Sequence, residues 1–411
     1  MDILKTTPGR PKFFLTPSGG RARGGRSGGA QHDAPRILIL GGYGRVGQEV
    51  ARYLLKATDA KLVLSSRTPR PVPHWMAPAS RARADITMLD VFDHHALLAE
   101  CMRASLVINC VGPSGIVGDR VAVACKQARV PLVDAGGYDP LLRSLEQAEE
   151  NDPTPVPLVI NVGLLPGLSG LFPQWLLDVR GNKQAVDELD VCYVGRDAWT
   201  YHSAWDIVSS LGGFGVDRGC CYLSGREIVR VPMRKATRRI AFPDPIGKVS
   251  AMLIHAEEIA RLAQQRRINT VRVYGANIGP RATLVCMLAK ILRLHRSPER
   301  IATGARWLAR ASARDMRTLE PAYGIHVDLR YRDGSSDSAT LTLADTYRAT
   351  GTVIGITAHM LLEGHGPGPG VFLLHDAVQS DRFMQCLRKE GLLEIHPRPE
   401  TAGMILKGVT A

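Results

Sequence analysis

The chain has 411 residues, 45% hydrophobic and 22% charged, which is typical of a soluble globular protein with two domains. No apolar run approaches the roughly 20 residues that a spanning helix needs, so we expect no membrane partner. The net charge of +13 either serves solubility or suits an acidic partner such as a carrier protein. Because no nucleic-acid motif accompanies it and aromatic residues are only 6%, we expect no nucleic acid.

Residues 1–34 are predicted to be a disordered basic tail. The first 31 carry six Lys and Arg against Asp2 alone and are rich in Gly, Ser and Pro, so they bury too little apolar surface to fold. They lack the apolar core of a secretory signal, which makes the cytoplasm the expected compartment. The eight cysteines form no C-x-x-C pair, which agrees with reduced thiols in that compartment.

A glycine-rich loop follows the first predicted strand, residues 36–40. Gly42, Gly44 and Gly47 satisfy G-x-G-x-x-G, and the next residues bury apolar side chains at helical spacing. In such loops the first glycine permits the turn, the second lets a pyrophosphate approach, and the third allows close packing of the helix on the strand. The predicted cofactor-binding residues of this loop are Gly42, Tyr43, Gly44, Arg45, Val46 and Gly47.

The end of the second predicted strand, residues 61–65, indicates which dinucleotide is bound. NAD-binding proteins place an acid there for the ribose 2′-hydroxyl, whereas this chain has Ser65, Ser66 and Arg67 and no acid before Asp85. Hydroxyls and a guanidinium suit a 2′-phosphate, and Arg45 is a second cation within expected reach of it. The sequence therefore predicts NADP(H) as the cofactor, and NADPH as its reducing form.

Strand and helix patterns continue to alternate. Further strands are predicted over residues 85–89, 106–111, 131–133 and 158–161, and helices over 120–128 and 140–151. Short connections between them indicate a doubly wound parallel sheet, which binds its ligand beyond the carboxyl ends of the strands. The residues expected at those ends are Asp90 and Val91 beside the adenine, Asn109, Val111 and Gly112 toward the nicotinamide, and Asp134, which either caps its loop or contacts substrate.

These motifs resemble those of the saccharopine dehydrogenase-like oxidoreductases. The glycine loop, residues 107–113, Val133-Asp134 and residues 163–168 (Gly-Leu-Leu-Pro-Gly-Leu) carry the likeness over residues 35–171. It resumes over 345–393, where Tyr347 and Thr350-Gly351 precede an apolar helix. The resemblance implies a Rossmann domain for the nicotinamide cofactor, an inserted domain that supplies the substrate wall, and C-terminal helices that return to the first domain.

The same resemblance implies two kinds of chemistry. Characterised members exchange hydride at a C–N bond, and relatives in biosynthetic clusters are thought to reduce C=C bonds of carrier-bound acyl chains. The chain departs from the amino-acid-forming members at Leu165, where they commonly have Asp. This departure argues against a lysine-pathway substrate.

A second group of elements follows the first sheet. Strands are predicted over residues 188–194, 230–241, 271–276, 325–331 and 338–344, the last two joined by the turn signal Asp333-Gly334, and helices over 255–265, 282–294 and 298–312. The predicted fold class is therefore α/β, a Rossmann doubly wound parallel sheet with an inserted α+β substrate domain. The predicted divisions are the tail at 1–34, the NADP-binding domain at 35–170, the inserted substrate or dimerisation domain at 171–345, and returning helices at 346–411.

The segment 199–206, after the first strand of the insert, concentrates groups that move protons. Reduction of an imine needs a proton at nitrogen, so Tyr201 or His202 is the predicted donor, with Asp206 setting the histidine tautomer. The alternative is that these side chains only fill a domain interface. Ser203 lacks the G-x-S-x-G context of a hydrolase nucleophile.

Two other groups of residues are candidates for binding. The basic side chains Arg234, Lys235, Arg238 and Arg239 form either a solvated strand edge or a docking patch for an acidic partner. His94, His95 and His365 lack a second ligand at suitable spacing, so we assign no metal.

The leading hypothesis from the sequence is an NADPH-dependent reductase of C=N bonds in an amino-acid-derived or specialised-metabolite pathway. The alternatives are an enoyl reductase acting in trans on a carrier-bound thioester and a non-catalytic NADPH-binding regulatory protein. The expected partner is a small-molecule or carrier-tethered substrate, and a homodimer is left open.

Overall fold

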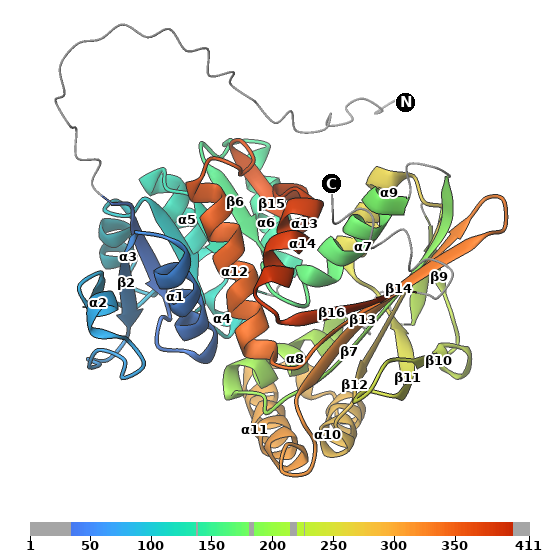
Figure 1. Ribbon diagram of the computed structural model, residues 1–411. Coiled ribbons are helices and arrows are strands. Elements are labelled where there is room, and N and C mark those ends of the chain that lie inside the picture. Colours follow the sequence, from blue (N-terminus) through green and yellow to red (C-terminus); the bar gives the residue numbers. More distant parts are fainter. Residues whose placement is uncertain (1–33, 137–138, 181–184, 214–219, 226, 398–411) are drawn as a thin grey trace, which may run out of the picture.

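The computed structural model describes residues 34–136, 139–180, 185–213, 220–225 and 227–397, which form two β-sheets that lie side by side (Figure 1). The predicted basic tail lies outside these residues except for Ala34. Within the described part of the chain, no helix is long and apolar enough to cross a membrane.

The first sheet has seven parallel strands in the order β15-β6-β5-β4-β1-β2-β3. Its strands are β1 (Arg36–Leu40), β2 (Lys61–Ser66), β3 (Ala84–Met88), β4 (Leu106–Asn109), β5 (Leu132–Asp134), β6 (Pro157–Ile160) and β15 (Gly370–Leu373). The first six lie within two residues of the predicted strand positions at their N-terminal ends. Short apolar runs identify most of them because a central parallel strand is buried on both faces, whereas the edge strand β3 is only half-buried.

Helices cover both faces of this sheet, as a doubly wound fold requires. The helices of this domain are α1 (Arg45–Ala57), α2 (Pro78–Arg81), α3 (His94–Cys101), α4 (Ser114–Val117), α5 (Arg120–Ala128), α6 (Asp139–Glu149) and α12 (Thr346–Leu362). Alternate residues of β1 point to opposite sides, so Ile37 and Ile39 share a core with α1 and α12, and Leu38 and Leu40 share one with α3, α5 and α6. Because β1 is buried between these two cores, the position of the glycine loop at its carboxyl end is fixed.

Helix α12 lies unusually close to α1, although about 300 residues separate them in the chain (Figure 1). A Cβ atom added to Gly351 would lie 3.0 Å from the main-chain carbon of Glu49 and 3.0 Å from the nitrogen of Val50. One added to Gly355 would lie 2.8 Å from Cγ of Tyr53. Glycine at these two positions lets the backbones approach, which holds the helix of the glycine loop against the C-terminal part of the chain.

The second sheet has nine strands in a mixed arrangement, with the path β10-β11-β12-β7-β13-β14-β16; off this path, β8 pairs with β12 and β9 pairs with β8. Its strands are β7 (Val186–Arg196), β8 (Cys221–Ser224), β9 (Glu227–Arg230), β10 (Thr237–Ala241), β11 (Lys248–Ile254), β12 (Thr270–Asn277), β13 (Ala322–Tyr331), β14 (Ser336–Leu343) and β16 (Leu393–Pro397). The turn at Asp333-Gly334 joins β13 and β14 as an antiparallel pair, as predicted.

Two groups of helices accompany the second sheet. The helices α7 (Leu168–Arg180) and α9 (Glu257–Arg266) pack on the face that carries Leu189, Val191 and Tyr193, and α13 (Leu374–Ala377) and α14 (Ser380–Lys389) join α7. The helices α8 (Tyr201–Gly213), α10 (Pro280–Ile291) and α11 (Pro298–Asp315) form a separate bundle with its own apolar core at the lower end of Figure 1.

Two predicted segments differ from the structure. Residues 230–241 are not one strand, because Pro232 lacks an amide hydrogen and opens a 3-10 turn (Met233–Lys235) between β9 and β10. Residues 346–411 are not helices alone: β15 extends the first sheet beside β6, and β16 pairs with β14 in the second. The C-terminal part of the chain therefore contributes to both sheets.

Candidate cofactor and active site

The glycine loop leaves β1 in a tight turn that the backbone hydrogen bond from Gly44 N to Gly41 O closes at 2.9 Å. Gly41, rather than Gly42, makes this turn, since its φ is +71° and a Cβ there would lie 2.9 Å from the carbonyl oxygen of Cys110. The packing role predicted for Gly47 agrees with the structure, because a Cβ on it would lie 2.8 Å from Cα of Gly42. Gly41 was not among the predicted cofactor-binding residues, because it lies just ahead of the G-x-G-x-x-G motif.

The first turn of α1 is open to a ligand. Gly44 is its N-cap and is exposed, and no side chain caps the helix. Val46 packs toward the core and the Tyr43 hydroxyl donates to the carbonyl of Pro71, so neither side chain covers the helix end. Uncapped amides with the positive end of the helix dipole suit the pyrophosphate of a dinucleotide.

Arg45 does not lie where the sequence placed it. It donates to the carbonyl of Ala198 at 2.9 Å, and its guanidinium stacks 3.5 Å from the centre of the Tyr347 ring. Asp197 lies 3.8 Å away. Arg45 thus connects the glycine loop to the segment that follows β7 and to α12, instead of pointing at a 2′-phosphate.

The end of β2 carries the three residues that were predicted to bind the 2′-phosphate. Ser65 is buried, Ser66 is half-buried with its hydroxyl on the carbonyl of Thr68, and Arg67 is exposed. After β3, the exposed Asp90 accepts from the amide of Phe92, while Val91 is buried.

The ends of β4 and β5 are tied together by a buried polar pair. Asn109 donates to Asp134 at 2.8 Å and accepts from the amide of Val111 at 3.0 Å. Asp134 also accepts from the amide of Gly136 at 2.6 Å. Burial raises the pKa of Asp134, and the bonds from Asn109 and Gly136 oppose that rise. These contacts show that Asp134 caps its loop. The ends of β4 and β5, with Gly112 beside them, form the floor of the candidate site.

Helix α8 faces this floor from the second domain. A Cβ on Gly112 would lie 3.5 Å from Cβ of His202 and 3.8 Å from the carboxylate of Asp206. Tyr201 and His202 are both exposed, with ring centres 5.6 Å apart. Partial burial and the charge of Arg67 lower the pKa of His202, which favours its neutral imidazole form.

Asp206 has a different partner from the one predicted. Its carboxylate accepts from the amide of Ser114 at 2.9 Å and lies 3.3 Å from the Ser114 hydroxyl. It therefore binds α8 to the loop after β4 rather than setting the tautomer of His202. Burial raises its pKa to about 6 against the hydrogen bonds that it accepts there.

Tyr347, at the start of α12, joins three parts of the site and was assigned no role from the sequence. Its ring stacks on Arg45, and its hydroxyl accepts from the amide of Thr200 at 2.9 Å and lies 3.3 Å from that of Ser203. A cavity of about 150 Å³ lies beside these residues, lined by Arg45, Gln48, Glu49, Asp345, Tyr347 and Arg348. The only sequence signal was its place in a motif of the resembled family, because its contacts lie far away in the chain.

The turn after β6 is anchored from the second domain. Glu258 of α9 is buried and accepts from the amide of Gly167 at 2.9 Å and from the hydroxyl of Ser169. Tyr323 of β13 donates to the carbonyl of Leu164 at 3.1 Å. The side chain of Leu165 nevertheless stays 49% exposed, so this turn presents an apolar group to a ligand.

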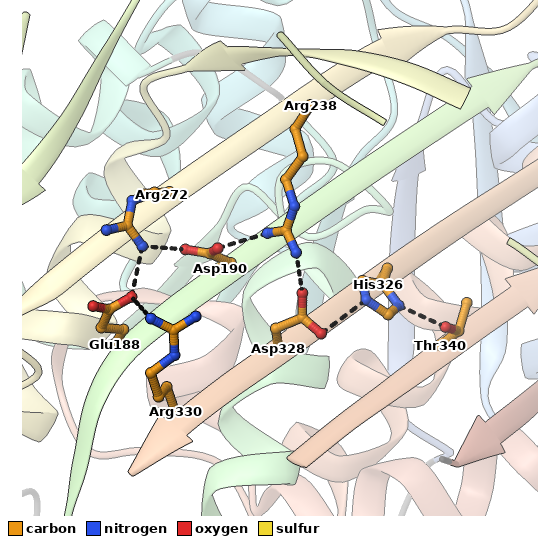
Figure 2. Close-up of polar contacts among 8 residues, drawn as sticks. All are labelled: Glu188, Asp190, Arg238, Arg272, His326, Asp328, Arg330 and Thr340. Carbon is orange, nitrogen blue, oxygen red and sulfur yellow. Dashed lines mark hydrogen bonds and ion pairs between the residues drawn. The ribbon is translucent and has the colours of Figure 1, made fainter. Parts of the chain in front are cut away.

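The predicted basic cluster is divided in the structure. Arg238 of β10 pairs with Asp190 at 2.6 Å and with Asp328 at 2.8 Å, inside a charge network that spans the second sheet (Figure 2). The other members of this network are Glu188, Arg272, His326, Arg330 and Thr340. Arg234, Lys235 and Arg239 are exposed, so a docking role concerns those three alone.

Among the described residues, the thiols and the side chains that could bind a metal form no second centre. All eight cysteines are free thiols. In the ranges that the structure describes, His, Cys, Asp and Glu side chains form no group of three suited to a metal ion.

Residues 37–156, which include this floor and the glycine loop, match the family model described as the saccharopine dehydrogenase NADP binding domain. The chain carries a saccharopine dehydrogenase-type NADP-binding domain. The resemblance stated from the sequence is thereby confirmed, and NADP(H) is the cofactor of this domain, as the acid-free stretch at Ser66 and Arg67 predicts. Its residues fit that cofactor, because the uncapped N-terminus of α1 could receive a pyrophosphate and the exposed Arg67 could reach a further phosphate.

Two known proteins extend the comparison. The chain is 29% identical over 122 residues to a protein of Arabidopsis thaliana named "Probable mitochondrial saccharopine dehydrogenase-like oxidoreductase", and the match covers 27% of each chain. It thus spans about a quarter of this curated relative's length. The apo structure of saccharopine dehydrogenase (L-Glu forming) from Saccharomyces cerevisiae aligns with a TM-score of 0.62 at 16% identity and covers 89% of this chain and 100% of that one. This structural likeness confirms the predicted fold class through both sheets.

Proposed function

We propose that the protein is an NADPH-dependent oxidoreductase that reduces a C=N bond in an amino-acid-derived or specialised-metabolite pathway. The observation that supports it best is the position of His202, which is exposed on α8 opposite Gly112 in the loop after β4, with the exposed Tyr201 ring beside it. In a doubly wound sheet the ligand lies beyond these strand ends. NADPH, when bound, supplies the hydride.

The side chains of α8 supply what the cofactor does not. Reduction at carbon leaves nitrogen in need of a proton, which either the hydroxyl of Tyr201 or the imidazolium form of His202 would deliver, leaving a phenolate or a neutral imidazole that water reprotonates. A neutral His202 can also orient the substrate, since one ring nitrogen donates and the other accepts. Asp206 acts as a positioning residue, because its carboxylate is engaged by Ser114.

Turnover of NADPH against imines, ketones and enoyl thioesters tests this proposal. We expect oxidation of NADPH with an imine, and a fall in kcat of about 10²- to 10⁴-fold in Tyr201→Phe or His202→Gln, whichever removes the proton donor. The affinity for NADPH should stay unchanged in both variants. His95→Gln, an exposed histidine on α3, is the matched control. Normal kcat in both α8 variants would refute the assignment of the donor.

Enoyl reduction on a carrier-bound thioester is the second candidate, which the exposed Leu165 at the turn after β6 favours. An apolar group there suits an acyl chain better than a charged amino acid. Turnover of an enoyl thioester that is lost when the acyl group is freed from its carrier would select this reaction. Tight NADPH binding without turnover of any compound in the panel would instead select a non-catalytic regulatory protein.

We also propose the cytoplasm as the compartment, supported by the free thiols of the described structure. The Arabidopsis relative has mitochondrial in its name, so imaging of the tagged full chain decides between the two locations.

A further inference from the structure

Helix α10 exposes a stripe of large apolar side chains. Their exposed fractions are 53% for Leu284, 54% for Met287, 40% for Leu288, 72% for Ile291 and 51% for Leu292, which follows the helix directly. At 100° per residue they occupy an arc of about 140° on one side of the helix. The opposite side carries the buried Ala282 and Ala289, which pack against α8 and α11. A surface helix normally turns polar residues outward, so this stripe requires an occupant.

The surroundings of the stripe are strongly basic. Residues 280–317, which include α10 and α11, carry nine Arg and Lys against two acidic residues. One of the acids, Asp315, is fully buried and accepts from the amides of Arg281 and Ala282. Glu299 is therefore the only exposed acid in this segment. The exposed basic residues are Arg281, Arg293, Arg296, Arg300, Arg306, Arg310, Arg314 and Arg317.

An amphipathic residue completes the pattern. Trp307 of α11 is 40% exposed, in a helix that lies beside α10 at the end of the molecule farthest from β15 and α6 (Figure 1). Tryptophan prefers the boundary between apolar and aqueous regions, because its ring is apolar and its N–H is polar.

We propose that α10 and α11 form a peripheral binding surface for anionic lipid bilayers, with the axis of α10 in the plane of the interface. An apolar stripe flanked by arginines combines the two attractions that hold an amphipathic helix at such a surface, burial of side chains below the headgroups and attraction to anionic lipid. The stripe protrudes from one convex helix, which a bilayer accepts without a matching groove.

Charge argues against a second copy as the occupant. A symmetric contact through α10 would bring two surfaces with the same excess of arginine together. A membrane surface as the partner departs from the sequence-based expectation of no membrane partner. That expectation rested on the absence of a long apolar run, whereas side chains spaced along one face of a helix never form such a run.

Co-sedimentation of the full chain with lipid vesicles tests the proposal. One set of vesicles contains phosphatidylcholine alone, and the other contains about 30% phosphatidylglycerol, which gives it an anionic surface. We expect at least about tenfold stronger binding to the anionic vesicles, weakened by high salt. The double variant Leu288→Ser with Ile291→Ser should lose about tenfold or more of that binding, since it removes two apolar side chains from the stripe. Met102→Ser with Phe92→Ser, two exposed apolar residues of the first domain, is the matched control and should bind like the wild type.

Affinity for NADPH and the thermal midpoint of unfolding show that each variant is folded. The basic residues ahead of Ala34 are unchanged in all of these proteins, so binding through them alone would survive in the α10 variant and overturn the inference. No binding to anionic vesicles would overturn it as well. A wild-type dimer in light scattering that the α10 variant converts to monomer would assign the stripe to a second copy.

Discussion

Two arginines near the glycine loop have different surroundings. Arg67 is exposed at the end of β2, where it follows Ser65 and Ser66, whereas Arg45 is held by the carbonyl of Ala198 and the ring of Tyr347. The difference separates a residue available to the cofactor from one that connects two domains. It also explains why both looked equivalent in the sequence, since the partners of Arg45 are about 150 and 300 residues away.

Arg67→Ala is expected to weaken NADPH binding by about 10- to 100-fold, because it removes charge-assisted hydrogen bonds to the 2′-phosphate. Binding of NADH should change by no more than about twofold, since NADH lacks that phosphate. Titrations of cofactor fluorescence measure both constants. Arg45→Ala serves as the comparison and should affect the two cofactors alike. Equal losses of NADH and NADPH in Arg67→Ala would contradict the assignment.

Asp206 makes the contact between the domains sensitive to pH. Its pKa is raised by burial to about 6, from 3.8 in an exposed aspartate. The folded protein therefore holds this proton more tightly than the unfolded chain does. The resulting stabilisation is fully present below pH 3.8 and is lost as the pH rises through about 6.

Asp206→Asn removes this titration while keeping an oxygen that accepts from Ser114. Between pH 4 and pH 7.5 the free energy of unfolding of the variant should rise relative to the wild type by roughly 1–3 kcal/mol. Urea unfolding at several pH values measures the difference. Asp85→Asn, on the exposed part of β3, controls for loss of a surface carboxylate. A difference that stays constant with pH would show that Asp206 titrates alike in both states.

At the scale of elements, the packing of α12 on α1 depends on two glycines. The neighbours of Gly351 are main-chain atoms of Glu49 and Val50, which cannot rotate away from an added methyl group. Helix propensity alone would favour alanine by about 1 kcal/mol at this position. The sign of the change in the free energy of unfolding of Gly351→Ala therefore shows whether steric overlap with α1 outweighs the gain in helix propensity.

Gly351→Ala should lower the free energy of unfolding by about 1–3 kcal/mol, as overpacking does in a well-filled core. Gly368→Ala is the control, since an added Cβ there meets no atom within 4 Å. Chemical unfolding of both variants, with NADPH affinity measured alongside, makes the comparison. Greater stability in Gly351→Ala than in the wild type would show that the two helices separate easily.

Across the whole molecule, the features that could be predicted are those that depend on residues close together in the sequence. The strands around the glycine loop were found because each is a short apolar run next to glycine or a polar end, and the NADP(H) preference followed from Ser66 and Arg67. The partner of Asp206, the stacking of Tyr347 on Arg45 and the placement of β15 were not predictable in this way. Each is a contact between segments more than 90 residues apart, and no local pattern records the partner.

The positions of β15 and α12 affect how the protein folds during translation. Strand β15 completes the first sheet beside β6, and α12 covers α1, yet both are translated only after the entire second sheet except β16. While the ribosome is still making the middle of the chain, β6 has an unpaired edge and α1 an uncovered flank. The NADP-binding domain, although most of it is translated first, therefore finishes folding late. A ribosome that stalls before residue 346 releases a chain in which this domain lacks α12 and β15.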